Sequence, residues 1–345
     1  MTYYYPFRLR ASLHETIWGG RRLERDGWKL LPPGDIAIGE SWETEISNVI
    51  QNGPYAGKTL GMLVEELGVS LLGKQAFAIF GQRFPLLAKF IDANAQLSVQ
   101  VHPKDSYAAL HEGGKLGKTE FWYILTAEPG ARIVYGFKTP TDRAEVAQAI
   151  QNVTLDRLLH EEQVQAGDVI YVPAGTVHAI GSGVMLYELQ EYSDVTYRMY
   201  DYGRLSASGK PRELHIEHSL DVAHYDVPRQ IKMKPIPLAN IHGYEDRCLI
   251  ACRYFLTHEL QLKEHTTIEG TTRNSCIIIS CLGERAQIFY GDGLKDSESI
   301  PRGETMVLPA ALGSYSLSGN GALLLSYVPE PTDKIWQQWQ TSNWV

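Results

Sequence analysis

Apolar residues along the chain fall in short runs that are separated by glycine, proline and other turn-forming residues. Short β-rich runs at regular intervals are typical of antiparallel barrels and sandwiches. We therefore predict strands over residues 85–92, 97–101, 120–125, 132–136, 168–172, 185–191 and 196–200, and again over 275–280, 286–290, 305–308 and 323–328. Two stretches differ, because apolar residues recur there at three- and four-residue spacing, which predicts helices over 59–73 and 141–160.

An internal repeat links the two halves of the chain. Residues 167–174 (GDVIYVPA) and 303–310 (GETMVLPA) both read as a turn, a buried strand and a proline-led turn, which indicates two related antiparallel β-barrels. His178 follows the first copy, whereas Ser314 stands at the corresponding count after the second. If this histidine binds a metal, only the first barrel has the means to do so.

The repeat and the strand pattern together predict a mainly β fold with two domains. Residues 227–237 are rich in proline and basic side chains and read as a linker. We expect a catalytic domain over 1–235 that carries both helical insertions, and a C-terminal β-domain over 236–345 without metal ligands. From about residue 238 onward the pattern is β throughout.

Composition limits the partners that the protein can have. With 345 residues, 44% of them hydrophobic and 21% charged, the chain can bury the cores of two domains. A net charge of −8 disfavours nucleic acid, whose phosphates need a basic face. The first ten residues lack the apolar core of a signal peptide and no run is long enough to span a bilayer, so we expect a cytoplasmic protein, a monomer or a homodimer.

The four cysteines lie in the last third of the sequence, and none forms a CxxC pair: Cys248, Cys252, Cys276 and Cys281. In a protein without an export signal, cysteines in predicted strands are expected to be reduced thiols, although two disulfides are the alternative.

The segment that ends the first repeat carries the first candidate for chemistry. Gly167, five residues, Pro173, one residue, Gly175, two residues and His178 form the second half of a cupin signature, whose final asparagine is here Ser182. In that motif a buried strand ends at a tight turn that aims one imidazole into the barrel. A structural histidine with satisfied hydrogen bonds is the alternative interpretation.

Polar companions to this histidine lie upstream. Because strand side chains alternate between faces, Ser98, Gln100 and His102 are expected on one face, with Leu97, Val99 and Val101 on the other. A solvent-facing strand gives the same pattern. Glu120 begins the next strand beside Phe121, Trp122 and Tyr123, where a buried carboxylate needs a cation.

Gln100, His102, Glu120 and His178 together offer two imidazoles, a carboxylate and an amide oxygen. Zinc with open coordination positions suits this set, and so does non-haem iron at the two histidines and the glutamate. The residues by themselves therefore leave open a zinc enzyme, a cupin-type iron dioxygenase and a non-catalytic sugar-binding cupin.

Five motifs in order resemble those of the type I mannose-6-phosphate isomerases, in their compact bacterial form: 84–89 (FPLLAK), 97–103 (LSVQVHP), 118–123 (KTEFWY), 173–179 (PAGTVHA) and 193–198 (SDVTYR). The resemblance covers roughly residues 10–215. It implies a double-cupin fold, one zinc per chain held by Gln100, His102, Glu120 and His178, and a sugar phosphate as substrate. The reaction implied is the interconversion of mannose 6-phosphate and fructose 6-phosphate through a cis-enediolate.

The same resemblance implies that Arg198 is the catalytic arginine and that Ser98 and Lys118 contact phosphate or sugar. Lys118 stands two residues before Glu120 and so shares its face, unless it is a solvated loop lysine.

Two further residues complete the candidate site. Glu188 lies among apolar neighbours that are expected to raise its pKa, which suits a proton carrier, although a salt bridge to an arginine is the alternative. Trp18 matches a family segment that walls the site, where it can stack on a sugar or simply fill the core.

Overall fold

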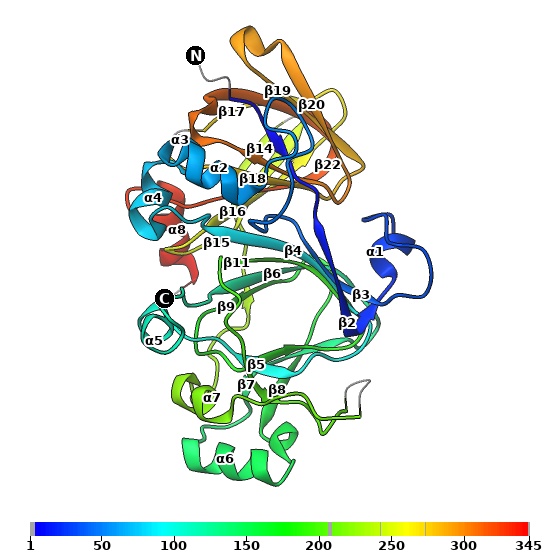
Figure 1. Ribbon diagram of the computed structural model, residues 1–345, viewed down its shortest axis with the longest axis vertical. Coiled ribbons are helices and arrows are strands. Elements are labelled where there is room, and N and C mark those ends of the chain that lie inside the picture. The colour runs from blue at the N-terminus through cyan, green and yellow to red at the C-terminus, as the bar shows by residue number, and fades with distance from the viewer. Residues whose placement is uncertain (1–3, 206–208, 242, 273, 344–345) are drawn as a thin grey trace.

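The computed structural model describes residues 4–205, 209–241, 243–272 and 274–343. Two antiparallel sheets form its N-terminal part (Figure 1). The seven-stranded sheet has the order β13 (Lys232–Met233), β9 (Val169–Val172), β6 (Glu120–Ala127), β11 (Val184–Glu191), β4 (Leu86–Ala93), β3 (Ile38–Trp42) and β2 (Ser12–Gly20). The five-stranded sheet has the order β12 (Tyr197–Tyr200), β5 (Val99–Val101), β10 (His178–Ile180), β7 (Arg132–Phe137) and β8 (Leu159–Gln163).

These two sheets pack face to face around a shared apolar core. Trp122 and Leu186 of the larger sheet contact the same cluster as Ile133 and Ile180 of the smaller one. All four side chains are at most 1% exposed. The strands alternate an inward and an outward face, so polar residues that interrupt the inward face are held inside the fold.

A third sheet forms the C-terminal part. It has the order β1 (Phe7–Arg8), β21 (Thr305–Leu308), β18 (Ile277–Cys281), β22 (Ser314–Tyr327), β16 (Leu256–Leu262), β15 (Tyr244–Ala251) and β14 (Ile236–Ile241). The strands β17 (Thr267–Thr271), β19 (Arg285–Tyr290) and β20 (Asp296–Pro301) join it through the long strand β22. The predicted mainly β fold of antiparallel sheets is confirmed.

Strand pairing repeats between the two parts. In the first, β6 pairs with β9 and β11, and in the second, β18 pairs with β21 and β22. Glu120 lies opposite Val172, and Ile277 lies opposite Leu308 at the corresponding place. The repeat read from the sequence thus has a structural counterpart, in which an isoleucine takes the place of the first part's glutamate.

The first predicted helix is present as α2 (Leu60–Leu67) and α3 (Val69–Leu72), which are separated by Gly68 at a φ of +48°. The second is too long as predicted. Helix α6 (Arg143–Gln151) is followed by the short turn η1 (Leu155–Arg157), and the chain then enters β8.

Four helices of at most seven residues were not predicted because they are short: α1 (Arg22–Arg25), α4 (Lys74–Phe80), α5 (Asp105–His111) and α7 (Ile216–Val222). The longer helix α8 (Lys334–Asn343) and the turns η2 (Asp292–Leu294) and η3 (Ala310–Leu312) were not predicted either. Helix α8 contradicts the all-β reading of the last third. The predicted linker over 227–237 is also partly wrong, because β13 and the start of β14 lie in it. None of the helices that the structure describes is long and apolar enough to cross a membrane.

The four cysteines are all buried, and each is a free thiol, as expected. Burial raises the pKa of the Cys248 thiol to about 12. These cysteines therefore fill the C-terminal core as neutral side chains.

Candidate active site

Two histidines and a glutamate converge between the two N-terminal sheets. Glu120 at the start of β6 places Oε1 3.3 Å from His102 Nε2 and Oε2 3.6 Å from His178 Nε2. One donor atom from each of the three side chains lies within 4.8 Å of the others, and all three residues are at most 1% exposed. Sequence positions that lie far apart are thus brought to one point by β5, β6 and β10.

A backbone carbonyl oxygen holds the ring nitrogen Nδ1 of each imidazole, on the side away from Glu120. His102 Nδ1 lies 3.0 Å from the carbonyl oxygen of Val195, and His178 Nδ1 lies 2.8 Å from that of Thr176. A backbone carbonyl needs a donor, so the proton resides on Nδ1 and leaves Nε2 as a free lone pair aimed at Glu120. This arrangement is the usual one for metal-binding histidines.

The inward-facing atoms lack hydrogen-bond partners in the described residues. His102 Nε2, His178 Nε2 and Glu120 Oε2 are all buried and unpartnered. Buried polar atoms without partners are costly, and a divalent cation bound by all three removes that cost. The donor set of two nitrogens and one carboxylate oxygen fits zinc or iron.

Electrostatics keeps these side chains in the form that binds metals. Burial, reinforced by the charge of Lys118, lowers the pKa of His102 to about 3. Burial also lowers the pKa of His178. Burial opposes the ionisation of Glu120, but Lys118 Nζ at 2.7 Å holds the pKa of that carboxyl well below its ordinary value. Neutral imidazoles and an ionised carboxylate are what a cation requires.

A cavity of about 210 Å³ lies next to this cluster: its lining includes Lys118, which pairs with Glu120, but none of the three side chains themselves. Residues from both N-terminal sheets line it, together with the segment after β11. All the other residues predicted for the site are among its lining: Trp18, Ser98, Gln100, Lys118, Glu188 and Arg198. Gln100 lies directly opposite His178 in the sheet, so the side chains of these two residues are on the same face.

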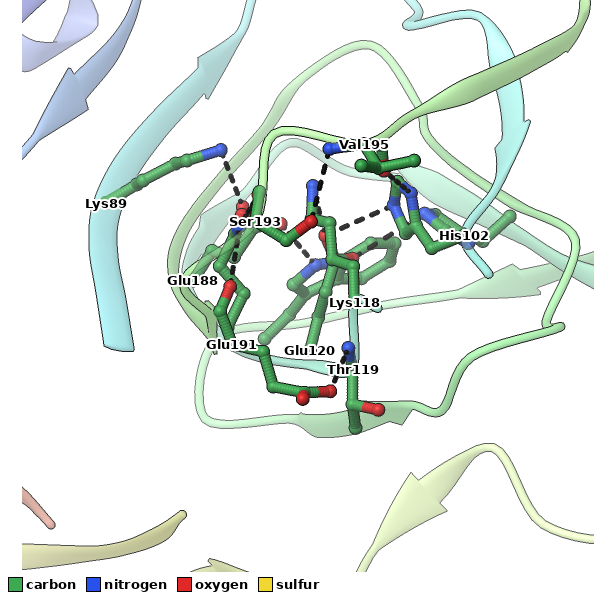
Figure 2. A network of polar contacts seen from close by, with 12 residues as sticks. Lys89, His102, Lys118, Thr119, Glu120, Glu188, Glu191, Ser193 and Val195 are labelled. Atoms are coloured by element: carbon green, nitrogen blue, oxygen red, sulfur yellow. Dashed lines mark hydrogen bonds and ion pairs between the residues drawn. The ribbon is translucent and has the colours of Figure 1, made fainter. Parts of the chain in front are cut away.

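Lys118 is buried and is not a solvated loop residue. Lys118 is 5% exposed and pairs with Glu120, while Glu191 accepts a hydrogen bond from the Thr119 backbone between them at 2.9 Å. Figure 2 shows Lys118 and Glu120 lying between Lys89 on one side and His102 on the other. The positive charge of Lys118 therefore lies against Glu120 of the three-residue cluster and also against the cavity.

Glu188 occupies the cavity wall with two partners. Its carboxylate accepts a hydrogen bond from Trp122 Nε1 at 2.9 Å and forms an ion pair with Lys89 Nζ at 3.2 Å. Burial, with the nearby charge of Glu120, raises the pKa of Glu188, as the apolar neighbours in the sequence had predicted. The ion pair anticipated as an alternative exists, but with a lysine instead of an arginine.

Arg198 lies at the mouth of the cavity, where its Nε is 3.4 Å from Ser98 Oγ and its NH1 donates to the Glu213 carbonyl at 2.9 Å. Desolvation and the charge of Arg212 lower the pKa of Arg198, although an arginine stays protonated in proteins. Trp18 is 6% exposed and belongs both to the core and to the cavity lining, so the two readings of this residue are compatible.

Several cavity residues were missed by the sequence analysis. Lys89 is buried in β4 between Glu188 and Glu40, whose carboxylates raise its pKa against the opposing effect of burial. Its signal was a lysine within a strand of otherwise buried residues. Arg212 also lines the cavity and pairs with Asp201 at 2.6 Å, but it comes from a loop that no pattern marked.

The turn before His178 depends on Gly175, which has a φ of +92° and donates its backbone N–H to the His102 carbonyl at 2.8 Å. A Cβ at this position lies 2.5 Å from His224 Nε2, whereas one at Gly167 (φ +88°) meets nothing within 4 Å. Gly167→Ala should therefore cost only the backbone strain of about 1–2 kcal/mol, and Gly175→Ala should cost more and weaken metal binding. Chemical denaturation and metal titration of both variants test this, and equal effects would refute the steric argument.

Comparisons with known proteins agree with this geometry. Residues 6–118 match the family model for the type I phosphomannose isomerase catalytic domain. The mannose-6-phosphate isomerase ManA of Bacillus subtilis is 36% identical over 94% of this chain and 99% of its own length, and the mannose-6-phosphate isomerase of Streptococcus mutans is 35% identical over the same shares. The chain belongs to the mannose-6-phosphate isomerase family.

Solved structures of the family extend the agreement to three dimensions. The crystal structure of the mannose 6-phosphate isomerase from Bacillus subtilis matches with a TM-score of 0.81 at 32% identity, over 93% of this chain and 99% of that one. A putative mannosephosphate isomerase from Archaeoglobus fulgidus shares the fold with a TM-score of 0.73 at 19% identity, over 95% of this chain and 98% of that one. The family thus accounts for both the N-terminal and the C-terminal β parts of the chain.

Proposed function

We propose that this chain is a zinc-dependent isomerase that interconverts mannose 6-phosphate and fructose 6-phosphate. The observation that carries the proposal is the set of three buried, unpartnered ligand atoms beside a cavity that Lys89, Lys118 and Arg198 line. A metal site next to convergent cations suits an anionic sugar better than the apolar substrate of an oxygenase. The activity in the names of the relatives supports the same assignment.

His102, Glu120 and His178 would hold the zinc, with Gln100 as the fourth ligand and one zinc per chain. When bound, the metal would act as a Lewis acid that stabilises negative charge on the sugar oxygens. The side chains around it would bind the sugar, orient it and move the proton.

Glu188 is the proposed proton carrier. Its carboxylate would take the proton from C2 of the open-chain aldose, which gives a cis-enediolate with its negative charge on O1. Movement of the hydroxyl proton from O2 to O1 would shift that charge to O2, and return of the first proton to C1 would then give the ketose. Burial raises the pKa of Glu188 towards neutral pH. A carboxyl group with a raised pKa both accepts a proton and gives it back more readily near that pH, as the two proton transfers require. The ion pair with Lys89 fixes the carboxylate at the cavity wall.

Arg198 would stabilise the charge of the enediolate, since a preorganised cation is most valuable where charge develops. Ser98, which touches Arg198, and Lys118 would hold the phosphate or the sugar hydroxyls. Trp18 would cover one face of the sugar ring.

We further propose two domains, residues 1–235 for catalysis and 236–345 as a second cupin-like domain without metal ligands. The enzyme would act in the cytoplasm on a free sugar phosphate, as a monomer or a homodimer. The net charge of −8 supports the expectation that it has no nucleic-acid partner.

Metal analysis of the purified protein, combined with an isomerase assay, tests the proposal. We expect about one zinc per chain, and we expect a chelator to abolish activity while circular dichroism stays β-rich, because the core forms without the metal ligands. Added zinc should restore activity. Iron with oxygen consumption would establish the dioxygenase instead, and zinc with sugar binding but no turnover would establish a binding protein.

A further inference from the structure

The C-terminal part encloses a cavity of about 400 Å³ that the proposed isomerase reaction does not use. Strands β15, β16, β17, β18 and β22 contribute to its walls. This volume is typical of pockets that bind small molecules, which span roughly 300–1,000 Å³. The lining combines aromatic, acidic and apolar side chains, including Tyr244, Tyr315, Tyr327, Asp246, His258 and Leu325.

The cavity occupies the place in the second part that the active-site cavity occupies in the first. His258 of β16 lies opposite Leu325 of β22, as Lys89 of β4 lies opposite Glu188 of β11. On the neighbouring strand, Asp246 lies opposite Leu260 of β16, just as Glu40 lies opposite Ile91 of β4. The strands that build the two cavities therefore match in order and in register.

The matching positions keep a basic side chain beside a carboxylate. Asp246 Oδ1 lies 3.0 Å from His258 Nδ1, at the positions that Glu40 and Lys89 hold in the first cavity, where the two charged atoms are 3.9 Å apart. His258 Nε2 lies 3.4 Å from the hydroxyl of Tyr327. A polar wall that can exchange hydrogen bonds with hydroxyl groups is thus present in both cavities.

The groups needed for reaction are replaced. Ile277 stands where the first part has Glu120, and Leu325 stands where it has Glu188. Ser314, which begins β22 as His178 begins β10, is exposed, and the next residue, Tyr315, is 5% exposed, lines the cavity and packs its ring on Gly270 of β17. Apolar side chains have therefore taken the positions of Glu120 and of the proposed proton carrier, and no imidazole stands at the position of His178.

We propose that this second cavity binds a neutral, unphosphorylated hexose without converting it. Tyrosine rings can stack on the C–H face of a sugar, and Asp246 and His258 can bind its hydroxyls. A phosphate is disfavoured, because Asp246, Glu269, Glu330 and Asp333 line the cavity and its described lining contains no lysine or arginine. An organic cation fits less well, because Asp246 already pairs with His258, and Asp333 accepts from the Tyr327 hydroxyl at 3.1 Å.

Saturation-transfer NMR with D-mannose on the full-length, metal-loaded protein tests this inference. Saturating mannose 6-phosphate occupies the active site, so signal that remains reports a second site. We expect the signal to persist and to vanish in Ile268→Trp, which fills the cavity from β17. Thr267→Trp, on the same strand at an exposed position outside the lining, is the matched control and should keep the signal.

A second variant is used if circular dichroism shows that Ile268→Trp does not fold properly. Asp246→Asn preserves volume and should weaken D-mannose binding about tenfold, the cost of one good hydrogen bond to a charged group. Complete displacement of D-mannose by mannose 6-phosphate, an unchanged signal in both cavity variants, or binding of tetramethylammonium in place of mannose would each overturn the inference. The isomerase activity of the variants is assayed separately. The D-mannose binding result can therefore be interpreted even if the protein does not catalyse the proposed reaction.

Discussion

His178→Ala should release the metal and lower kcat/KM on mannose 6-phosphate by at least about a thousandfold, or roughly 4 kcal/mol of transition-state stabilisation. The imidazole is fully buried, and its Nε2 lies 3.6 Å from Glu120 Oε2, where a metal ion would bind both. Without it, Glu120 and His102 supply two ligand atoms from protein side chains beside Gln100, too few to keep zinc at ordinary free concentrations.

Metal content by mass spectrometry and steady-state kinetics measure this effect together. The apo forms of wild type and His178→Ala should unfold at similar denaturant concentrations, which separates loss of metal from loss of fold. Ser314→Ala is the control from the second repeat, where the side chain is exposed, and it should change neither zinc content nor activity. Full zinc occupancy in His178→Ala would show that the metal, if bound, lies elsewhere.

Eleven of the 22 strands in the described residues could be predicted from the sequence, because these strands are short, apolar and bounded by turns. Strand β22 was only half predicted. Its middle contains Gly319, Asn320 and Gly321, which read as a turn, yet the strand continues and pairs with β19 through this segment. Tertiary pairing has overridden the local turn preference there.

Strand β2 and helix α8 were also missed, because local sequence patterns do not mark them. Strand β2 is half-buried or exposed along most of Ser12–Gly20 and buried only at Trp18 and Gly19, so neither face gives a period-two signal. Helix α8 follows a long β region, and the full burial of Trp339 against the sheet depends on contacts with residues distant in the sequence.

The convergence of His102, Glu120 and His178 into a candidate metal site could be predicted because the three residues sit in motifs with a fixed spacing to turns and strands. Lys89 could not be assigned a role, because its partners Glu40 and Glu188 come from β3 and β11, and β3 was itself not predicted. The turns that follow β9 and β21, residues 173–177 and 309–313, have the same length, so Ser314 begins β22 as His178 begins β10. The side chains nevertheless differ in placement, because Ser314 is exposed and the next residue, Tyr315, is buried.

Lys118 and Arg198 should separate recognition of the phosphate from stabilisation of the reaction. Lys118 is a buried cation that lines the cavity, and its charge should matter most for a dianionic substrate. Lys118→Met should therefore lower kcat/KM on mannose 6-phosphate by about ten- to a hundredfold, equivalent to one charged hydrogen bond of roughly 1.5–3 kcal/mol. On free mannose the loss should be much smaller.

Arg198→Lys should instead reduce turnover on both sugars, because charge that develops at C1 and C2 does not depend on the group at C6. The planar guanidinium touches Ser98 at the cavity mouth, and a lysine cannot reproduce its fixed set of donors. Loss of one such donor typically costs about a hundred- to a thousandfold in kcat. Steady-state kinetics of the two variants on the two sugars gives the four ratios required.

The ion pair between Lys118 and Glu120 suggests a second role for this lysine, which would contradict the predicted selectivity for the phosphorylated sugar. If Lys118 serves chiefly to hold the Glu120 carboxylate, at 2.7 Å, in place for the metal, then Lys118→Met will lose zinc and lose activity equally on both substrates. Zinc content of Lys118→Met, measured beside its kinetics, distinguishes the two roles. Full zinc with a selective loss on mannose 6-phosphate assigns this lysine to the phosphate, and Lys118→Arg, which keeps the charge, should then recover part of that loss.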